Sequence, residues 1–428
     1  MPTDLIIYNA GQLLTLTSPG KPKRGTDMAD LGIVEDGAVA VHEGQIVAVG
    51  HSAEILSEFS DALQLDAEGQ VVMPGFVDPH THVVWAGERA GEFELRVAGA
   101  SYMEIMAAGG GIMSTVRATR AASLNEIAAQ TRPRLDIMLA HGTTTAEAKS
   151  GYGLTLEDEL KLLQAIHLLD ESHPVDLVPT FLGAHAVPSE YAGRTDEYVD
   201  LVVEEMIPAV ANLRYREAET SKDIPAARFC DVFCEAGVFD LDQSRRILET
   251  AKKHHMGLKI HSDEFEPLGG TLLAVELGAV SADHLVRTTP EQLAALAASD
   301  TIAVALPGTP FGLGEHEYTP ARSIIDQGGA LALATDLNPG TCWCESMQLM
   351  IALACRYMRM TPAEAITAAT INAAHAVASG NRVASLEVGK QADILILNVS
   401  DYRHLGYRFG TNLVRTVIKH GEIVHTAS

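Results

Sequence analysis

His80 and His82 are the residues of this sequence best suited to chemistry. They form a His-x-His pair directly after the apolar run Val71 to Val77. Side chains on a strand alternate between its two faces, so a strand through this run would direct both imidazoles to one side. Two convergent imidazoles make half of a metal site, although a strand histidine is more often a hydrogen-bonded structural residue than a ligand.

Three further candidate ligands follow downstream. His261, His284 and Asp336 each close a short run of β-prone or small residues. Imidazoles and a carboxylate, with no thiolate in the set, suit a catalytic Zn or non-haem Fe site that keeps one position for water. The sequence therefore predicts a catalytic metal site.

The composition indicates a globular protein with an acidic surface. Of 428 residues, 47% are hydrophobic, enough for one large domain and a smaller one. The 31 basic and 56 acidic residues give a net charge of -25, which argues against a nucleic-acid or anionic-membrane partner. Five cysteines, an N-terminus without a secretion signal and no apolar run near the roughly 20 residues of a membrane span favour a cytoplasmic location.

Both ends of the chain have the alternating pattern of short β-strands. The strand candidates cover residues 4–16, 37–50, 392–397 and 414–425. Neither set is large enough to stand alone, so we expect the two to pair in one small β-sandwich domain. The predicted division of the chain is 1–70, 71–380 and 381–428, with the first and last segments forming the small domain.

The central segment alternates short apolar runs with helical stretches at close to the roughly 30-residue spacing of a βα unit. Eight strand candidates end near His82, Lys149, His185, Glu235, His261, His284, Pro307 and Asp336. Capping boxes at Ser123, Thr289 and Thr361 indicate helix starts. The prediction is an α/β fold, a (β/α)8 TIM-like barrel, in which catalytic groups gather at the C-terminal strand ends.

Several blocks of sequence resemble a known family. They are Pro74 to His82, Glu92 to Leu95 with Gly99 to Tyr102, Gly109 to Arg117, Thr143 to Gly153, Phe181 to Ala186, Asp263-Glu264 with Pro267 to Gly270, Ser281 to Leu285, and Ala334 to Gly340. Together with the two-ended β domain, they resemble the metal-dependent amidohydrolase superfamily and, within it, the imidazolonepropionase family. The resemblance covers nearly the whole chain.

The resemblance implies a metal-dependent cyclic amide hydrolase that opens 4-imidazolone-5-propanoate to N-formimidoyl-L-glutamate in histidine degradation. It implies one Zn or Fe ion per chain, held by His80, His82, His261 and Asp336, that activates a water and polarises the ring carbonyl. Asp336 would carry a proton to the leaving nitrogen, and His284 would stabilise the oxyanion or orient the water. Glu264 would hydrogen-bond a ring nitrogen.

A substrate with a carboxylate tail needs a cation in so acidic a protein. Arg89, seven residues after His82, offers a planar two-pronged donor. The resemblance implies the same role and adds substrate contacts from Tyr152, His185, Glu264, Asn338, Gly340 and Thr341. The alternative for Arg89 is a surface salt bridge with Glu88 or Glu92.

Other candidates have simpler interpretations. Lys149 resembles a carboxylated metal-bridging lysine, but the fourth strand, where such a residue usually stands, contains no lysine, so one metal is expected. Cys230 and Cys234 are expected to be buried. The Cys342-Trp343-Cys344 stretch departs from the family pattern. Gly109 to Gly111 predict a mobile loop over the site.

Two other functions remain open. A deaminase of the same superfamily, acting on a cytosine-like ring, would use a similar set of ligands, and a noncatalytic assembly protein would have kept only the fold. By resemblance a homodimer is expected.

Overall fold

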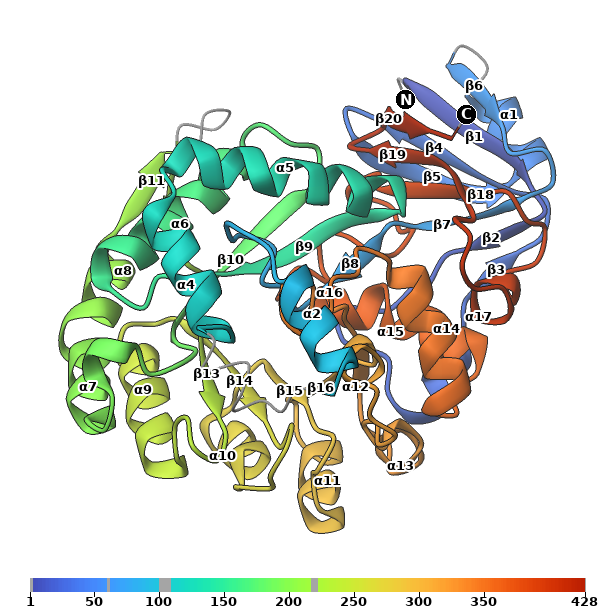
Figure 1. Ribbon diagram of the computed structural model, residues 1–428. Coiled ribbons are helices and arrows are strands. Elements are labelled where there is room, and N and C mark those ends of the chain that lie inside the picture. The colour runs from blue at the N-terminus through green and yellow to red at the C-terminus, as the bar shows by residue number, and fades with distance from the viewer. Residues whose placement is uncertain (1–2, 60–61, 100–108, 217–221, 428) are drawn as a thin grey trace.

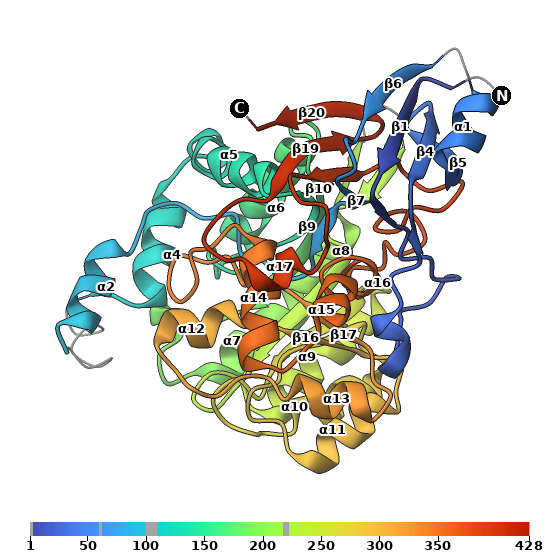
Figure 2. The same cartoon turned by 90° about the vertical axis from the view of Figure 1, so that its right-hand side faces the viewer.

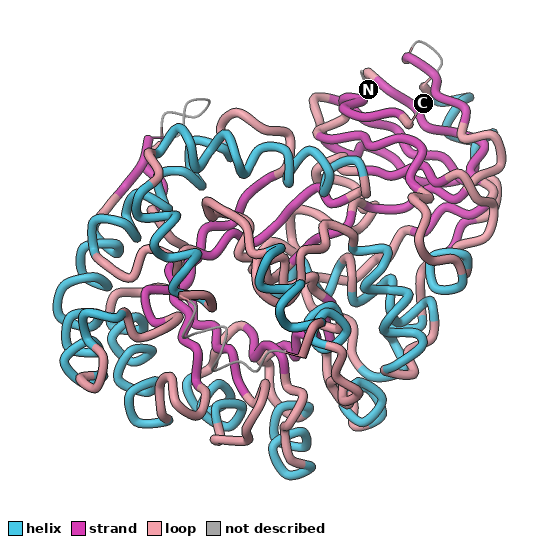
Figure 3. Tube along the Cα trace, in the orientation of Figure 1, coloured by secondary structure: helices cyan, strands magenta, loops and turns pink. Residues whose placement is uncertain are grey.

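A ring of eight parallel strands forms the centre of the molecule (Figure 3). The computed structural model describes residues 3–59, 62–99, 109–216 and 222–427. In ring order the strands are β8 (Phe76–Asp78), β9 (Thr143–Lys149), β10 (Asp176–Ala184), β13 (Phe229–Cys234), β14 (Gly257–Ser262), β15 (Ser281–His284), β16 (Ile302–Ala305) and β17 (Leu331–Leu333). All neighbours run parallel, so their C-terminal ends open at the same end of the ring. The predicted barrel is confirmed.

The ring is closed by the segments that follow its first and last strands. Thr81 forms an isolated parallel bridge with Leu337. The backbone N–H of His82 donates to the carbonyl of Leu337 at 2.9 Å, and that of Asp336 donates to the carbonyl of His80 at 3.1 Å. These bonds join the loops of the first and eighth strands at the candidate ligands themselves.

Helices cover the outside of the ring (Figures 1 and 3). They are α4 (Ile112–Ala121), α5 (Leu124–Ala140), α6 (Leu156–Asp170), α7 (Thr195–Leu201), α8 (Ile207–Asn212), α9 (Leu241–Lys253), α10 (Gly270–Leu277), α11 (Pro290–Ala297), α12 (Gly308–Leu313), α13 (Ala321–Asp326), α14 (Met347–Tyr357), α15 (Pro362–Ala368) and α16 (Ile371–Ala376). A further helix, α2 (Ala90–Val97), is set apart from this layer (Figure 2). The capping boxes predicted at Ser123, Thr289 and Thr361 are all present. Figure 2 shows α2 projecting from the body of the molecule.

Two elements interrupt the regular alternation. A short antiparallel pair, β11 (Arg214–Arg216) and β12 (Asp223–Pro225), lies between β10 and β13 in the sequence. Nothing in the sequence pattern predicted it.

Within the described part of the chain, the helices are all too short or too polar to cross a membrane.

The two ends of the chain build two further sheets that pack on each other. The four-stranded sheet contains β1 (Leu5–Ala10), β4 (Gly37–His42), β5 (Gln45–His51) and β6 (Leu63–Asp66), beside α1 (Ser52–Glu58). The six-stranded sheet contains β2 (Gln12–Leu14), β3 (Ile33–Val34), β7 (Val71–Pro74), β18 (Ile394–Leu397), β19 (Val414–Lys419) and β20 (Glu422–Thr426), with α17 (His404–Tyr407) between β18 and β19 along the chain.

The pairing of β7 with β18 joins the two ends of the chain, and Figure 1 shows both termini in this part of the molecule. One apolar cluster takes side chains from both sheets, among them Ile7 and Val39 from one and Val72 and Ile394 from the other. The expected β structure from both chain ends is confirmed. By its pairing β7 belongs to this sheet, and β8 begins two residues later; the division at residues 70 and 380 stays a prediction.

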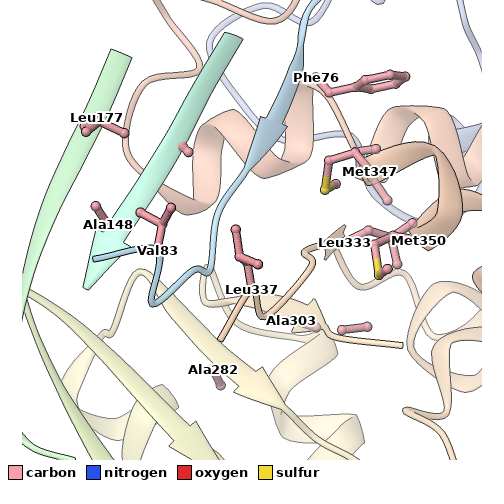
Figure 4. Packing of buried hydrophobic residues seen from close by; sticks show 14 of the residues in the cluster. Phe76, Val83, Ala148, Leu177, Ala282, Ala303, Leu333, Leu337, Met347 and Met350 are labelled. Atoms are coloured by element: carbon pink, nitrogen blue, oxygen red, sulfur yellow. The ribbon is translucent and has the colours of Figure 1, made fainter. Parts of the chain in front are cut away.

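A large buried cluster between the ring and the helices holds the loops that carry the site. Figure 4 shows Val83 and Leu337 among its side chains, with Met347 and Met350 of α14 nearby. Both Val83 and Leu337 are fully buried. Because Val83 follows His82 and Leu337 follows Asp336, burial worth about 1.5–3 kcal/mol per side chain fixes both loops in the core.

The ligand-bearing strands are shorter than the sequence indicated. β8 ends at Asp78 and β17 ends at Leu333, so the His-x-His pair and Asp336 lie just beyond the strands. The expectation that His80 and His82 lie on the strand was therefore wrong. The shortening has a local cause, because the carboxylate of Asp78 accepts the backbone N–H and the hydroxyl of Thr335 and takes the place of ladder bonds.

Candidate active site

Three histidines and one aspartate gather donor atoms at the C-terminal end of the ring. Nε2 of His82 lies 3.4 Å from Nε2 of His261 and 3.5 Å from Oδ1 of Asp336. Nε2 of His80 lies 3.6 Å from the same oxygen. Donors bound at about 2.1 Å in a tetrahedral arrangement are about 3.4 Å apart, so this spacing fits one metal ion.

The protonation of these donors also suits a metal. Burial lowers the pKa of His80 and of His82 well below the ordinary value, which favours the neutral imidazoles that bind metals. Burial raises the pKa of Asp336 to about 6, because its negative charge loses the hydration of bulk water. Nε2 of His80 finds no hydrogen-bond partner among the described residues, as expected of a ligand atom. The residues present fit a divalent cation.

Two buried aspartates orient the ligands from behind. Nδ1 of His80 lies 2.6 Å from Oδ2 of Asp283, and Nδ1 of His261 lies 3.1 Å from Oδ2 of Asp231. The contact with Asp283 holds the proton on Nδ1 of His80 and leaves its Nε2 free for a metal, whereas Asp231 lies within ion-pair distance of His261 without hydrogen-bond geometry.

A buried ion network supports these aspartates. Nζ of Lys149 lies 2.6 Å from Asp231 and 2.9 Å from Glu147, and Nζ of Lys259 lies 2.9 Å from Glu147. Burial alone would lower the pKa of Lys149, but the charges of Asp231 and Glu147 outweigh it and raise the pKa. Carboxylation of a lysine needs the neutral amine, so the charged state of Lys149 supports the interpretation with a single metal.

His284 and Glu264 lie beside the donors. The ring centroid of His284 is 5.2 Å from that of His261, and its Nδ1 is 3.6 Å from Oε2 of Glu264. His284 also has a ring nitrogen close enough to His80 and Asp336 to form a second possible donor group. Burial, and then the charge of Asp336, raise the pKa of Glu264 well above its ordinary value, which favours a protonated carboxyl that can donate a hydrogen bond.

Aromatic rings line the site beside His82. The ring of His185 stacks on His82 at 4.7 Å and 14°, and Tyr152 lies 5.2 Å from His185. Burial, and then Asp336, raise the pKa of the Tyr152 hydroxyl, while the charge of Arg89 lowers it. Phe233 lies 5.7 Å from the ring of His261 and was not identified from the sequence.

Arg89 forms the ion pair that was weighed as its alternative. Nε of Arg89 donates to Glu92 at 2.7 Å, and the same carboxylate accepts the N–H of Gly111 at 3.1 Å and the hydroxyl of Ser114 at 2.9 Å. The other edge of the guanidinium lies against Gly340, where an added Cβ would be 2.4 Å from Nη1. Arg89 is therefore held between the first and eighth loops, and its contact with substrate stays a prediction.

Asn338 organises the eighth loop. Its Oδ1 accepts the N–H groups of Gly340 and Thr341, each at 2.8 Å, and its Nδ2 donates to the carbonyl of Asp336 at 2.7 Å. The amide is thus engaged with its own loop, and substrate contacts from Asn338, Gly340 and Thr341 stay predictions.

The remaining candidates are structural. Cys230 and Cys234 are buried, as expected, and Cys342 is buried while Cys344 is partly exposed. Gly109 and Gly111 have positive φ values of 83° and 77° and lead into α4, as a turn requires. The predicted mobile loop, and the part of the family resemblance from Ala100 to Tyr102, involve residues 100–108, which lie outside the described residues.

Four buried charged side chains near the site were not identified from the sequence. Glu147, Asp231, Lys259 and Asp283 all lie on barrel strands and are fully buried. A signal was present, because Lys259 stands two positions before His261 in an apolar run, and period two places both side chains on one face.

The barrel and its donor set define an amidohydrolase. The sequence profile of the amidohydrolase family matches residues 71–424. Imidazolonepropionase of Herpetosiphon aurantiacus is 58% identical over 98% of this chain and 97% of its own length, and that of Chloroflexus aggregans is 50% identical over 99% of each. A zinc-bound adenosine deaminase from Xanthomonas campestris has a TM-score of 0.71 at 20% identity, covering 99% of this chain and 93% of its own, which shows the shared fold. The chain belongs to the amidohydrolase family, in its imidazolonepropionase branch.

Proposed function

We propose that this protein hydrolyses the ring amide of 4-imidazolone-5-propanoate to N-formimidoyl-L-glutamate, with a water activated by one metal ion. The observation that supports this most directly is a four-donor cluster in a chain that is 58% identical to an imidazolonepropionase over nearly its whole length. His80, His82, His261 and Asp336 would hold the ion.

When bound, Zn(II) or Fe(II) supplies Lewis acidity, which polarises the ring carbonyl and lowers the pKa of a water. Asp336, whose Oδ1 lies beside His80 and His82, would carry the proton from this water to the leaving ring nitrogen. His284 would stabilise the developing oxyanion or orient the water. The raised pKa of Glu264, caused first by burial, suits a carboxyl that donates a hydrogen bond to a substrate ring nitrogen.

Arg89 and the aromatic rings beside His82 would select the substrate. Arg89 would bind the propanoate, and its fixed position between two loops limits the entropy that binding must overcome. Tyr152 and His185 would complete the lining beside the ring of His82. The loop of Asn338, Gly340 and Thr341 would contact the far side of substrate or product.

Further properties complete the proposal. Imidazoles with one carboxylate accept both Zn(II) and Fe(II), so either would serve as the single cofactor. The net charge of -25 argues against nucleic acid or an anionic membrane as partner. We propose a homodimer in the cytoplasm.

The test is the ultraviolet decay of 4-imidazolone-5-propanoate with purified protein, before and after chelation and after restoration with Zn(II) or Fe(II). We expect decay that chelation abolishes and metal restores, with N-formimidoyl-L-glutamate as product. Absence of turnover by protein that holds one metal per chain would refute this substrate and point to the superfamily deaminases. Failure to bind metal would instead point to a noncatalytic role.

A further inference from the structure

The helix that follows the seventh strand of the barrel contributes a hydroxyl to the donor cluster. Thr309 lies in the first turn of α12, a few residues after the end of β16, and its hydroxyl donates to Oδ2 of Asp336 at 2.5 Å. Both residues are buried, with relative exposures of 2% and 3%. The other carboxylate oxygen, Oδ1, is the one that lies 3.6 Å from Nε2 of His80 and 3.5 Å from Nε2 of His82.

The backbone around this contact is fixed from several sides. Gly308 packs so tightly that a Cβ there would lie 2.5 Å from Sγ of Cys342 and 2.9 Å from the carbonyl of Thr335. Asp336 has a φ of 57°, a left-handed conformation that costs a residue with a side chain free energy and persists when its surroundings impose it. Its N–H and carbonyl are held by His80 and Asn338.

These bonds fix the main chain of Asp336 but leave the carboxylate free to rotate about the Cβ–Cγ bond. A rotating carboxylate can present either oxygen, or both, to a cation. Presenting both would fill an additional coordination position, and a catalytic site must keep a position open for water. The hydroxyl of Thr309 contacts Oδ2 and therefore distinguishes it from Oδ1, which faces His80 and His82.

We propose that Thr309 is a positioning residue for the hydrolytic reaction, holding Asp336 so that only Oδ1 faces the metal and Oδ2 stays outside its coordination. This inference rests on the proposed function, because it concerns the same donor cluster. It assigns a role to the strand-seven loop, for which neither the sequence nor the family resemblance suggested one.

The experiment compares two substitutions that differ in one group. Thr309→Val keeps the shape of the side chain and removes the hydroxyl, whereas Thr309→Ser keeps the hydroxyl and removes the methyl. Thr301→Val is the matched control: Thr301 precedes the same strand at its opposite end, is 3% exposed, and donates its hydroxyl to the carbonyl of Ala279 at 2.9 Å. Each protein is reconstituted with Co(II) as well as Zn(II).

Three readouts are needed: the visible absorption of the Co(II) form, the rate of Zn(II) loss to a chelator, and kcat and KM. We expect Thr309→Val to alter the Co(II) spectrum, to change metal loss or kcat by about 10–100-fold, and to leave KM within about threefold. Thr309→Ser should have a Co(II) spectrum, a rate of Zn(II) loss and kinetic constants close to those of the parent. Thr301→Val should change none of these readouts.

An unchanged Co(II) spectrum and unchanged metal loss in Thr309→Val would overturn the inference, as would a serine variant that behaves like the valine variant. The spectrum separates this outcome from failure of the proposed function. If the parent binds Co(II) but does not open 4-imidazolone-5-propanoate, a spectral difference between the valine and serine variants still supports the role of Thr309.

Discussion

Oδ2 of Asp283 lies 2.6 Å from Nδ1 of His80, and both side chains are completely buried. This pair decides which nitrogen of His80 is available, because a proton held on Nδ1 leaves the lone pair of Nε2 directed at the other donors. Asp283 also lies 3.8 Å from Nζ of Lys259, which links the ligand to the charge network of the ring.

Asp283→Asn should weaken metal binding by about 10–100-fold, because the amide is a poorer acceptor for the Nδ1 proton. The rate of Zn(II) loss to a chelator measures this effect. Asp136→Asn is the control, since Asp136 pairs with His173 at 3.2 Å outside the donor cluster. Equal metal retention in the parent and both variants would show that Asp283 does not orient His80.

Lys259→Met should destabilise the fold by about 3–5 kcal/mol, because Glu147 loses one of its buried cationic partners. The melting temperature of the purified protein measures the loss. Lys252→Met, which removes the partly buried bond to the carbonyl of Leu277, should cost far less. Adding Glu147→Gln to the Lys259 variant should recover part of the loss, and a double variant that melts lower still would contradict the charge explanation.

Arg89→Met should mainly raise KM, since its proposed role is to bind the substrate carboxylate. A charged hydrogen bond worth about 1.5–3 kcal/mol corresponds to roughly 10- to 150-fold in kcat/KM. Steady-state kinetics measure the change. Arg132→Met, which removes two exposed hydrogen bonds to Ser172, is the control. Unchanged kinetics in the Arg89 variant would leave the ion pair with Glu92 as the whole role of Arg89.

Asp170 gives a pH dependence that can be tested away from the site. Burial raises the pKa of Asp170 to about 6, above its ordinary value of 3.8. The folded state therefore binds its proton more tightly than the unfolded state, and stability falls as pH rises through this interval. Asp170→Asn removes the penalty while keeping an oxygen that can accept the N–H of Leu177.

We expect the Asp170→Asn protein to be more stable than the parent by about 1–3 kcal/mol above pH 7 and to match it below pH 4. Denaturation of both proteins at pH 3.5 and pH 7.5 measures the difference. A gain of equal size at both pH values would assign the effect to packing rather than ionisation.

Features of the site that depend on local sequence pattern could be predicted from the sequence. The βα spacing predicted the barrel, and the runs that end at His80 and His82, His261, His284 and Asp336 made these residues candidates. The choice of four metal ligands among them came from the family resemblance. Contacts between strands distant in sequence were not predictable in this way. The pairing of Lys149 with Asp231 depends on which neighbours the ring brings together, and a single sequence does not state that.

Local exceptions also escaped prediction. The side chain of Asp78 ends β8 early by bonding to Thr335, which no periodicity indicates. The pairing of Arg89 with Glu92 was weighed, yet its choice over Glu88 depends on bonds from Gly111 and Ser114 that only the fold supplies.

The pairing of β7 with β18 has a consequence for how the protein is made. Pro74 lies opposite Ile394 in this antiparallel pair. One edge of β7 therefore stays unpaired while the residues between the two strands are synthesised. The His-x-His pair follows this strand by a few residues and receives its aspartate partner only when Asp336 has emerged from the ribosome. The four-donor set is therefore complete only late in synthesis, and a prematurely terminated chain would expose an open sheet edge of the kind that drives aggregation.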